Sequence, residues 1–116
     1  MKRNDHIESQ QRLQHIITSL EKLDNFVKDK TRDSFCKDIM LQSAVLLQFI
    51  IIGEAITHVE NSKLEKYNYP WHKVRSFRNL IAHEYFQIKM NAVWEIIIQD
   101  LPELKIVIVN ILENEF

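Results

Sequence analysis

The sequence has very few of the residues that form tight turns or cross-link a chain. Its 116 residues include one glycine, two prolines and one cysteine. A fold with many tight turns depends on glycine and proline, so this composition favours long helices instead. A lone cysteine, Cys36, cannot form a disulfide within the chain, which fits a reducing cytoplasm. We therefore expect an all-α, cytoplasmic protein.

The chain also lacks a large excess of charge and a long hydrophobic run. Its formal net charge is −1, so no overall positive field attracts nucleic acid, and any anion site must be local. The most apolar run, residues 44–53, is interrupted by Gln48 and is shorter than the ~20 residues of a membrane span. The basic first residues are followed by no apolar signal-peptide core. The length favours one domain, residues 1–116, with no membrane segment.

A local basic patch lies between Trp71 and Lys89. It contains only one acidic residue, Glu84, against four cationic ones: Lys73, Arg75, Arg78 and Lys89. His72 lies one turn before Arg75 and belongs to the same stretch. These side chains are candidate RNA contacts, although a charged run on a helix is often only a solvated face.

Apolar residues recur every three or four positions in the first half of the chain, which is typical of amphipathic helices. We expect one helix over roughly residues 7–27, capped by Asn4 or Asp5. Asp33 or Ser34 is the expected cap of a second helix, from about Phe35 to about His58. Residues 46–52 are apolar on nearly every side, so this part should lie in the bundle centre or in a subunit interface.

In the second half, a polar connector over residues 60–69 leads to a third helix that should begin at Pro70. Its expected buried residues are Trp71, Val74, Phe77, Leu80 and Ile81. Asn91 can cap a last helix, which Pro102 should break or restart with Asp100 as a cap. Residues 106–109 have strand propensity, and periodicity alone leaves helix and strand both open there.

Arg78, His83 and Tyr85 form the most informative motif of the sequence. Arg78 offers a planar fork of donors to phosphate oxygens, and the imidazole of His83 can take or give a proton near neutral pH. His83 is five residues from Arg78 and rotated away from it on a regular helix, so a helix end near His83 could bring the two together. The motif therefore suggests chemistry on a phosphodiester.

This motif resembles the signature of HEPN-domain ribonucleases, in which arginine is followed by four residues, histidine, any residue and tyrosine. The whole chain resembles the HepT-like toxin family of HEPN proteins. Six features carry the resemblance, and they occur in the family's order: Ile52-Gly53-Glu54-Ala55, Pro70-Trp71, Arg78-Asn79, His83-Glu84-Tyr85-Phe86, Val93-Trp94-Glu95 and Asp100-Leu101-Pro102-Glu103-Leu104.

The resemblance implies an up-and-down HEPN bundle of four to six helices that dimerises and acts as a metal-independent endoribonuclease toxin, without a cofactor. It implies a nucleotidyltransferase antitoxin as partner. Arg78 and His83 would be the catalytic pair, and Tyr85 would be the residue that the antitoxin modifies with AMP. Asn79 matches the polar residue that commonly follows the arginine.

The chemistry of RNA cleavage without a metal agrees with a dimer. Attack by the ribose 2′-hydroxyl requires a base, an acid for the leaving oxygen and stabilisation of a highly charged phosphorane. Arg78 suits the last role. One histidine cannot easily be base and acid at once, so two copies of His83 in one cleft would supply both.

Glu54 follows the only glycine, Gly53, inside an apolar helix. One interpretation is a close helix crossing over Gly53 with Glu54 at the solvent edge; the other has Glu54 pairing with Arg78 and orienting it. The remaining histidines, His6, His15, His58 and His72, show no spacing typical of metal ligands, so we expect no metal site.

The competing function is a binding module rather than another enzyme. In that case the helical dimer would hold a nucleotide or the nucleotidyltransferase without cutting RNA. Growth arrest on expression, relieved by Arg78→Ala or His83→Ala, separates the ribonuclease from the module.

Overall fold

The computed structural model describes residues 2–116, with side chains from residue 5 onward. It contains seven α-helices, and these residues include no strand, so the predicted all-α class is confirmed. The α-helices are α1 (Lys2–Val27), α2 (Arg32–Lys37), α3 (Ile39–Thr57), α4 (Asn61–Leu64), α5 (Trp71–His83), α6 (Met90–Glu95) and α7 (Leu101–Glu115). A 3-10 turn, η1 (Tyr85–Gln87), follows α5, and a π-helical turn, η2 (Ile96–Asp100), joins α6 to α7.

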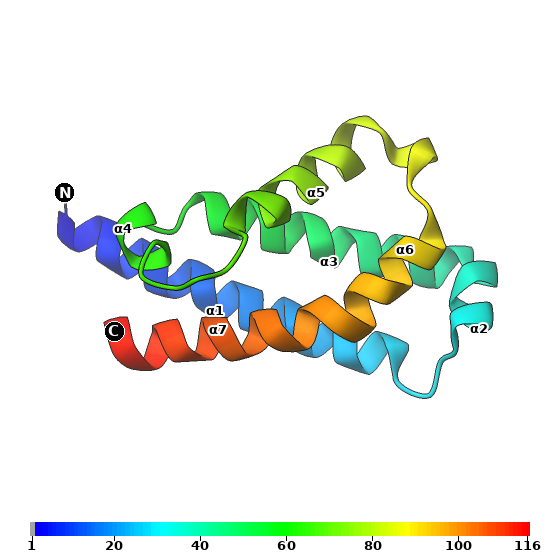
Figure 1. The fold of residues 1–116 in the computed structure, drawn as a ribbon, viewed down its shortest axis with the longest axis horizontal. Coiled ribbons are helices and arrows are strands. Elements are labelled where there is room, and N and C mark those ends of the chain that lie inside the picture. Colours follow the sequence, from blue (N-terminus) through cyan, green and yellow to red (C-terminus); the bar gives the residue numbers. More distant parts are fainter. Residues whose placement is uncertain (1) are drawn as a thin grey trace.

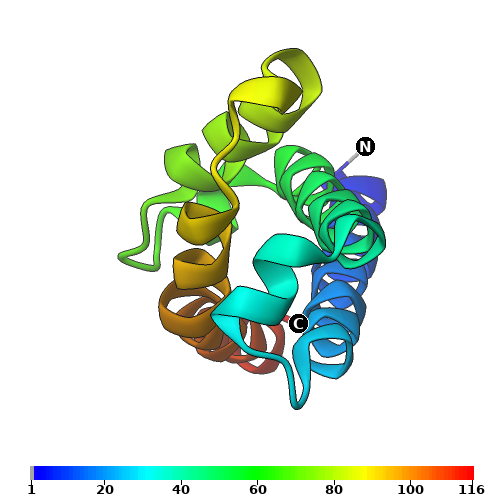
Figure 2. The ribbon, with the colours of Figure 1, turned by 90° about the vertical axis from the view of Figure 1, so that its right-hand side faces the viewer.

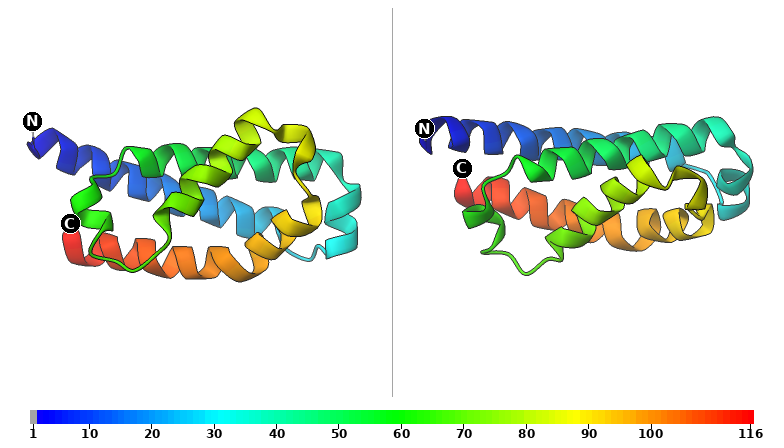
Figure 3. Two further views of the ribbon diagram at one scale, coloured as in Figure 1. Left: turned by 45° about the horizontal axis from the view of Figure 1, so that its top comes forward. Right: turned by 90° about the horizontal axis from the view of Figure 1, so that it is seen from above.

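The long helices run up and down along the longest axis of the molecule (Figure 1). The helix α1 packs against both α3 and α7, and the two termini lie at the same end of the bundle. The short helix α2 covers the other end, where it contacts α6 (Figure 2). The helix α5 packs on α3 and runs obliquely beside it (Figure 3). Its far end, with η1, forms a corner that projects from the bundle in Figure 1.

The hydrophobic core fills the space between α1, α3 and α7. Its fully buried side chains come from all three helices and include Leu13, Ile16, Val45, Ile56, Ile108 and Ile111. Burial of each such side chain contributes about 1.5–3 kcal/mol relative to exposure. The apolar stretch 46–52 lies mostly in this core, so the bundle centre was the correct one of its two expected locations for most of it. Leu47, on its outer side, is 54% exposed.

The first two expected helices differ from the observed ones at their ends. Because α1 already includes Asn4 and Asp5, the prediction that either residue caps it was wrong. The second predicted helix is divided at Asp38, whose side chain accepts a hydrogen bond from the backbone N–H of Leu41 and starts α3. The shorter helix α2 is capped by Thr31 instead of Asp33 or Ser34.

The connector and the third helix follow the sequence more closely. The connector over 60–69 contains the single helical turn α4, which its polar composition did not reveal. Pro70 occupies the capping position of α5 rather than its first helical position. Trp71 and Ile81 are buried as expected, but Leu80 is 41% exposed, so that part of the prediction was wrong.

The last part of the chain is more continuous than expected. The helix α6 begins at Met90, before Asn91, so Asn91 does not cap it; the Asn91 amide oxygen instead accepts a hydrogen bond from the thiol of Cys36. Pro102 lies in the first turn of α7, where its missing N–H costs nothing. The π-helical turn η2 joins α6 directly to α7, with no loop between them. Asp100 makes no side-chain capping bond. Residues 106–109 are helical.

By length and composition alone, α3 is also long and apolar enough to cross a membrane. The helix nevertheless packs against α1 and α5, and eight of its 19 residues are buried. Core helices of this kind share their composition with membrane spans, so its apolar character follows from its central position.

Candidate functional site

Arg78 is held where α5 crosses α3 at their closest approach. A Cβ atom on Gly53 would overlap with the Cβ of Arg78 and lie 2.8 Å from its Cγ and 3.3 Å from the carbonyl oxygen of Val74. Only glycine leaves room for this contact. The sequence puts its single glycine at this position, and the close helix crossing considered from the sequence is present.

Glu54, the next residue of α3, forms an ion pair with the arginine. Its Oε2 lies 3.1 Å from one terminal guanidinium nitrogen of Arg78. The two interpretations of Gly53-Glu54 are therefore both correct, because the same crossing gives Arg78 space and a carboxylate partner. Asn79 completes the arrangement, since its side-chain oxygen accepts a hydrogen bond of 3.0 Å from the other terminal nitrogen.

The guanidinium group keeps donors for a ligand. Arginine carries five N–H groups, and Glu54 and Asn79 each engage one terminal nitrogen. The Nε atom of Arg78 is buried and has no hydrogen-bond partner within the part of the chain that the structure describes. The side chain as a whole is 33% exposed, so a phosphate can reach its outer edge. This is an arginine with a fixed orientation and free hydrogen-bonding capacity.

His83 and Tyr85 lie beyond Arg78, at the projecting corner. The helix α5 ends at His83, as the sequence suggested, and Tyr85 opens the turn η1. His83 is exposed, and no hydrogen bond or ion pair within residues 5–116 joins its side chain to Arg78. Tyr85 is 42% exposed and packs edge to face on Phe86, with ring centroids 5.5 Å apart. Within one subunit, no hydrogen bond or ion pair among the described residues links His83 or Tyr85 to Arg78.

The candidate RNA contacts do not form one surface. Lys73 lines a groove beside α5, whereas Arg75 points the other way and donates a hydrogen bond of 3.2 Å to the Asn61 side chain. Residues two positions apart on a helix, such as Lys73 and Arg75, differ by about 200° in direction, which accounts for the separation. His72 and Lys89 are exposed, Lys89 just before α6.

The groove is an apolar cavity of about 670 Å³ between α3, α5 and the segment from η2 to α7. Aromatic and aliphatic side chains line it, among them Phe49, Phe77, Leu80 and Leu104. Tyr69 also lines it. Burial, together with the nearby carboxylates of Asp100 and Glu103, raises the pKa of the Tyr69 phenol.

A second polar cluster was missed in the sequence. His58, which caps the end of α3, contacts Glu54, 3.3 Å away, and Glu8 on α1, 3.5 Å away. The four-residue spacing of Glu54 and His58 on one helix was a usable signal, but the contribution of α1 depends on the tertiary fold. No group of three or more potential metal ligands occurs among residues 5–116.

Comparison with known proteins identifies the class to which this bundle and its arginine–histidine motif belong. The family model described as "Ribonuclease HepT-like" matches residues 16–111. The chain belongs to the HepT-like family of HEPN-domain ribonucleases, as the resemblance of its sequence implied.

Individual relatives agree with this assignment. The chain is 34% identical over 104 residues to a protein of Caldanaerobacter subterraneus named "Putative RNase", covering 89% of this chain and 93% of the relative. It is 29% identical to the "Probable ribonuclease HepT" of Thermococcus cleftensis, with 80% of this chain and 86% of the relative covered.

The name of a longer relative includes a second activity. The chain is 38% identical over 103 residues to a "Gamma-glutamylcyclotransferase and putative RNase" of Methanocaldococcus jannaschii, covering 88% of this chain but only 46% of the relative. The chain thus spans about half the length of that protein. No solved structure matches the chain at a comparable level of significance.

Proposed function

We propose that this protein is the toxin of a toxin–antitoxin pair and cleaves RNA in the cytoplasm as a metal-independent endoribonuclease. The observation that carries the proposal is the arginine of a ribonuclease motif fixed by Glu54 and Asn79, yet one-third exposed. Family membership supports the ribonuclease activity. The reaction mechanism is proposed from the chemistry of the site residues, and the antitoxin partner from the resemblance to the HepT-like toxins.

In this mechanism Arg78 stabilises the phosphorane. The 2′-hydroxyl of a ribose attacks the adjacent phosphorus, the bond to the 5′-oxygen breaks, and a 2′,3′-cyclic phosphate and a 5′-hydroxyl result. Negative charge develops on the non-bridging oxygens, and a preoriented guanidinium offers them two parallel N–H donors. Glu54 and Asn79 hold the group in place, so that little of its conformational freedom remains to be lost during the reaction.

His83 supplies the proton transfers, with a second subunit. Its exposed position at the end of α5, without a hydrogen bond to Arg78 among the described residues, supports a site completed by another copy of the chain. One His83 then removes the proton of the 2′-hydroxyl, while the other protonates the leaving oxygen. A two-fold dimer places both copies at one cleft.

Tyr85 is the proposed point of control by a nucleotidyltransferase antitoxin. Its phenol is 42% exposed at the projecting corner, beside the fully accessible Phe86, so a modifying enzyme can reach it. Transfer of AMP would put a bulky phosphate-bearing group near the site and oppose RNA binding sterically and electrostatically. We expect Tyr85→Phe to remain toxic in the presence of the antitoxin; unmodified Tyr85 in protein purified with its antitoxin would contradict this role.

Expression in a bacterial host tests the function against the binding-module alternative. The wild type should arrest growth and degrade RNA, whereas folded Arg78→Ala and His83→Ala variants should do neither. Lys37→Ala is a matched surface control on α2 that should stay toxic. A wild type that is harmless and leaves RNA intact would favour the non-catalytic module.

A further inference from the structure

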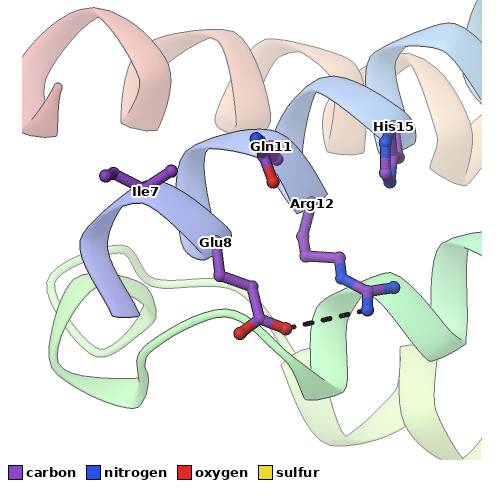
Figure 4. A pocket seen from close by; sticks show the side chains of 5 residues that line it. All are labelled: Ile7, Glu8, Gln11, Arg12 and His15. Atoms are coloured by element: carbon purple, nitrogen blue, oxygen red, sulfur yellow. Dashed lines mark ion pairs between the residues drawn. The ribbon is translucent and has the colours of Figure 1, made fainter. Parts of the chain in front are cut away.

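A line of five charged or titratable side chains connects α5 to α1 across the surface of α3. Arg78 pairs with Glu54 at 3.1 Å, Glu54 with His58 at 3.3 Å, and His58 with Glu8 at 3.5 Å. Glu8 then pairs with Arg12 at 3.7 Å, one turn along α1. Figure 4 shows Glu8 and Arg12 on the same side of α1, joined by this ion pair. The site arginine therefore belongs to a network of three helices.

His58 is the member that carries a charge in these pairs only when it is protonated. Its Nε2 faces an oxygen of Glu54 and its Nδ1 faces an oxygen of Glu8. A neutral imidazole has one N–H and can donate to only one of these carboxylates, whereas an imidazolium can donate to both. Protonation of His58 thus strengthens its contact with Glu54 and adds a positive charge between the two acids.

Glu54 cannot serve both partners equally well in both states. One oxygen, Oε1, meets His58, and the other, Oε2, meets Arg78. When His58 is neutral, the charge of Glu54 mainly offsets that of Arg78. When His58 is charged, the carboxylate is shared, and the guanidinium presents more uncompensated positive charge to its exposed edge.

We propose that His58 is a positioning residue that controls Arg78 through Glu54, so that protonation of His58 makes the site arginine bind an RNA phosphate more tightly. The inference rests on the proposed function, because it assigns Arg78 to phosphate. The groups facing His58 are Glu54 from α3 itself, Glu8 and Arg12 from α1, and Arg78 from α5 through Glu54.

The expected effect is moderate. The side chains of His58, Glu54 and Glu8 are between 42% and 47% exposed, so solvent screens their interactions. Pairs of this exposure change an equilibrium by about two- to fivefold. The decisive signature is therefore a change in pH dependence rather than the size of any single affinity.

The test measures binding of a single-stranded 2′-O-methyl oligonucleotide, which has no attacking hydroxyl, at about pH 6 and about pH 8. The His72→Asn/His83→Asn protein is the starting background, because neither candidate RNA-contacting histidine is then present. We expect this protein to bind about two- to fivefold more tightly at the lower pH through His58. Adding His58→Gln should remove that gain, and adding His58→Lys should give tight binding at both pH values.

Two further variants identify the route and provide a control. In a Glu54→Gln background, His58→Gln should no longer alter the pH dependence, because the carboxylate that links His58 to Arg78 is gone. His15→Gln should leave the pH dependence unchanged. His15 lies beside Arg12 in Figure 4, but within the described residues it contacts no carboxylate.

The inference is overturned if His58→Gln keeps the pH dependence of the starting protein, or if His58→Lys binds no more tightly than His58→Gln at the higher pH. A merely structural role would weaken binding equally at both. Absence of oligonucleotide binding at either pH would refute both proposals. The expected pH dependence of binding without cleavage by the wild type would refute only the proposed ribonuclease activity. Cleavage by the wild type with no effect of His58→Gln on the pH dependence of binding would refute only this inference.

Discussion

The two sides of α5 differ in how firmly contacts with the rest of the chain fix their side chains. On one side Arg78 is fixed by the crossing over Gly53, the ion pair with Glu54 and the hydrogen bond to Asn79. On the other side Phe77 and Leu80 face an apolar groove of about 670 Å³. The same 13-residue helix thus supports a fixed polar site and an open apolar surface. Under the proposed function, we expect the chemistry on the Arg78 side of α5 and a mainly structural role for the groove side.

The largest predicted effect is on the polar side. Arg78→Ala should reduce the rate of RNA cleavage by about 10²–10³, the loss expected when one preoriented donor group for a developing anion is removed. Ser76→Ala, on the groove side of the same helix, should keep the wild-type rate. Single-turnover cleavage by folded proteins, checked by circular dichroism, measures the difference. Equal losses in both variants would remove the distinction between the two sides.

The groove side should respond in stability instead. Phe77 packs edge to face on Phe49, with ring centroids 5.2 Å apart. Because it is only partly buried, Phe77→Ala should lower the free energy of unfolding by about 2–3 kcal/mol, less than for a fully buried phenylalanine. Denaturant unfolding measures this loss, and the folded fraction should still cleave RNA. A rate loss comparable to that of Arg78→Ala would place the groove in the reaction.

The crossing itself can be perturbed through Gly53. In an exposed helix, Gly→Ala is stabilising by about 0.5–1 kcal/mol. Here the added Cβ would meet the Cβ and Cγ of Arg78, so Gly53→Ala should instead destabilise by about 1–3 kcal/mol and slow cleavage by displacing the arginine. Denaturant unfolding and cleavage assays on one preparation measure both. A more stable and fully active variant would show that α3 and α5 do not meet as described.

The smallest effect concerns Tyr69, which lines the groove. Burial and the carboxylates of Asp100 and Glu103 raise its pKa above the ordinary value of about 10. The unfolded chain therefore loses this proton first, and the associated stability is complete below pH ~10 and falls as pH rises through the pKa of folded Tyr69. An alkaline absorbance titration should show a late-ionising tyrosine that Tyr69→Phe removes. An unchanged titration in that variant would contradict the buried environment.

The sequence predicted the features that depend on local pattern. Helical periodicity, the scarcity of glycine and the motif were sufficient for the all-α class, a helix end near His83 and the close helix crossing at Gly53. The break at Asp38 was missed because apolar periodicity continues on both sides of it, and a capping side chain decided the boundary. The start of α7 at Leu101, with Pro102 in its first turn, agrees with the predicted restart, but the π-helical turn that joins it to α6 was missed.

Tertiary arrangement accounts for what the sequence did not reveal at the site. His58 and Glu8 are 50 residues apart, and only the packing of α1 on α3 brings them together. The same packing extends the site from Arg78 to Arg12. Conversely, the basic residues Lys73 and Arg75 looked like one patch in the sequence but point to different sides of α5.

The most direct test of the central claim is the chemistry of the RNA ends produced by purified protein in excess chelator. The account predicts cleavage by the wild type with 2′,3′-cyclic phosphate and 5′-hydroxyl ends, and cleavage about 10²–10³ times slower by Arg78→Ala. Products with 5′-phosphate ends that form only when magnesium is added, or undiminished cleavage by Arg78→Ala, would contradict it.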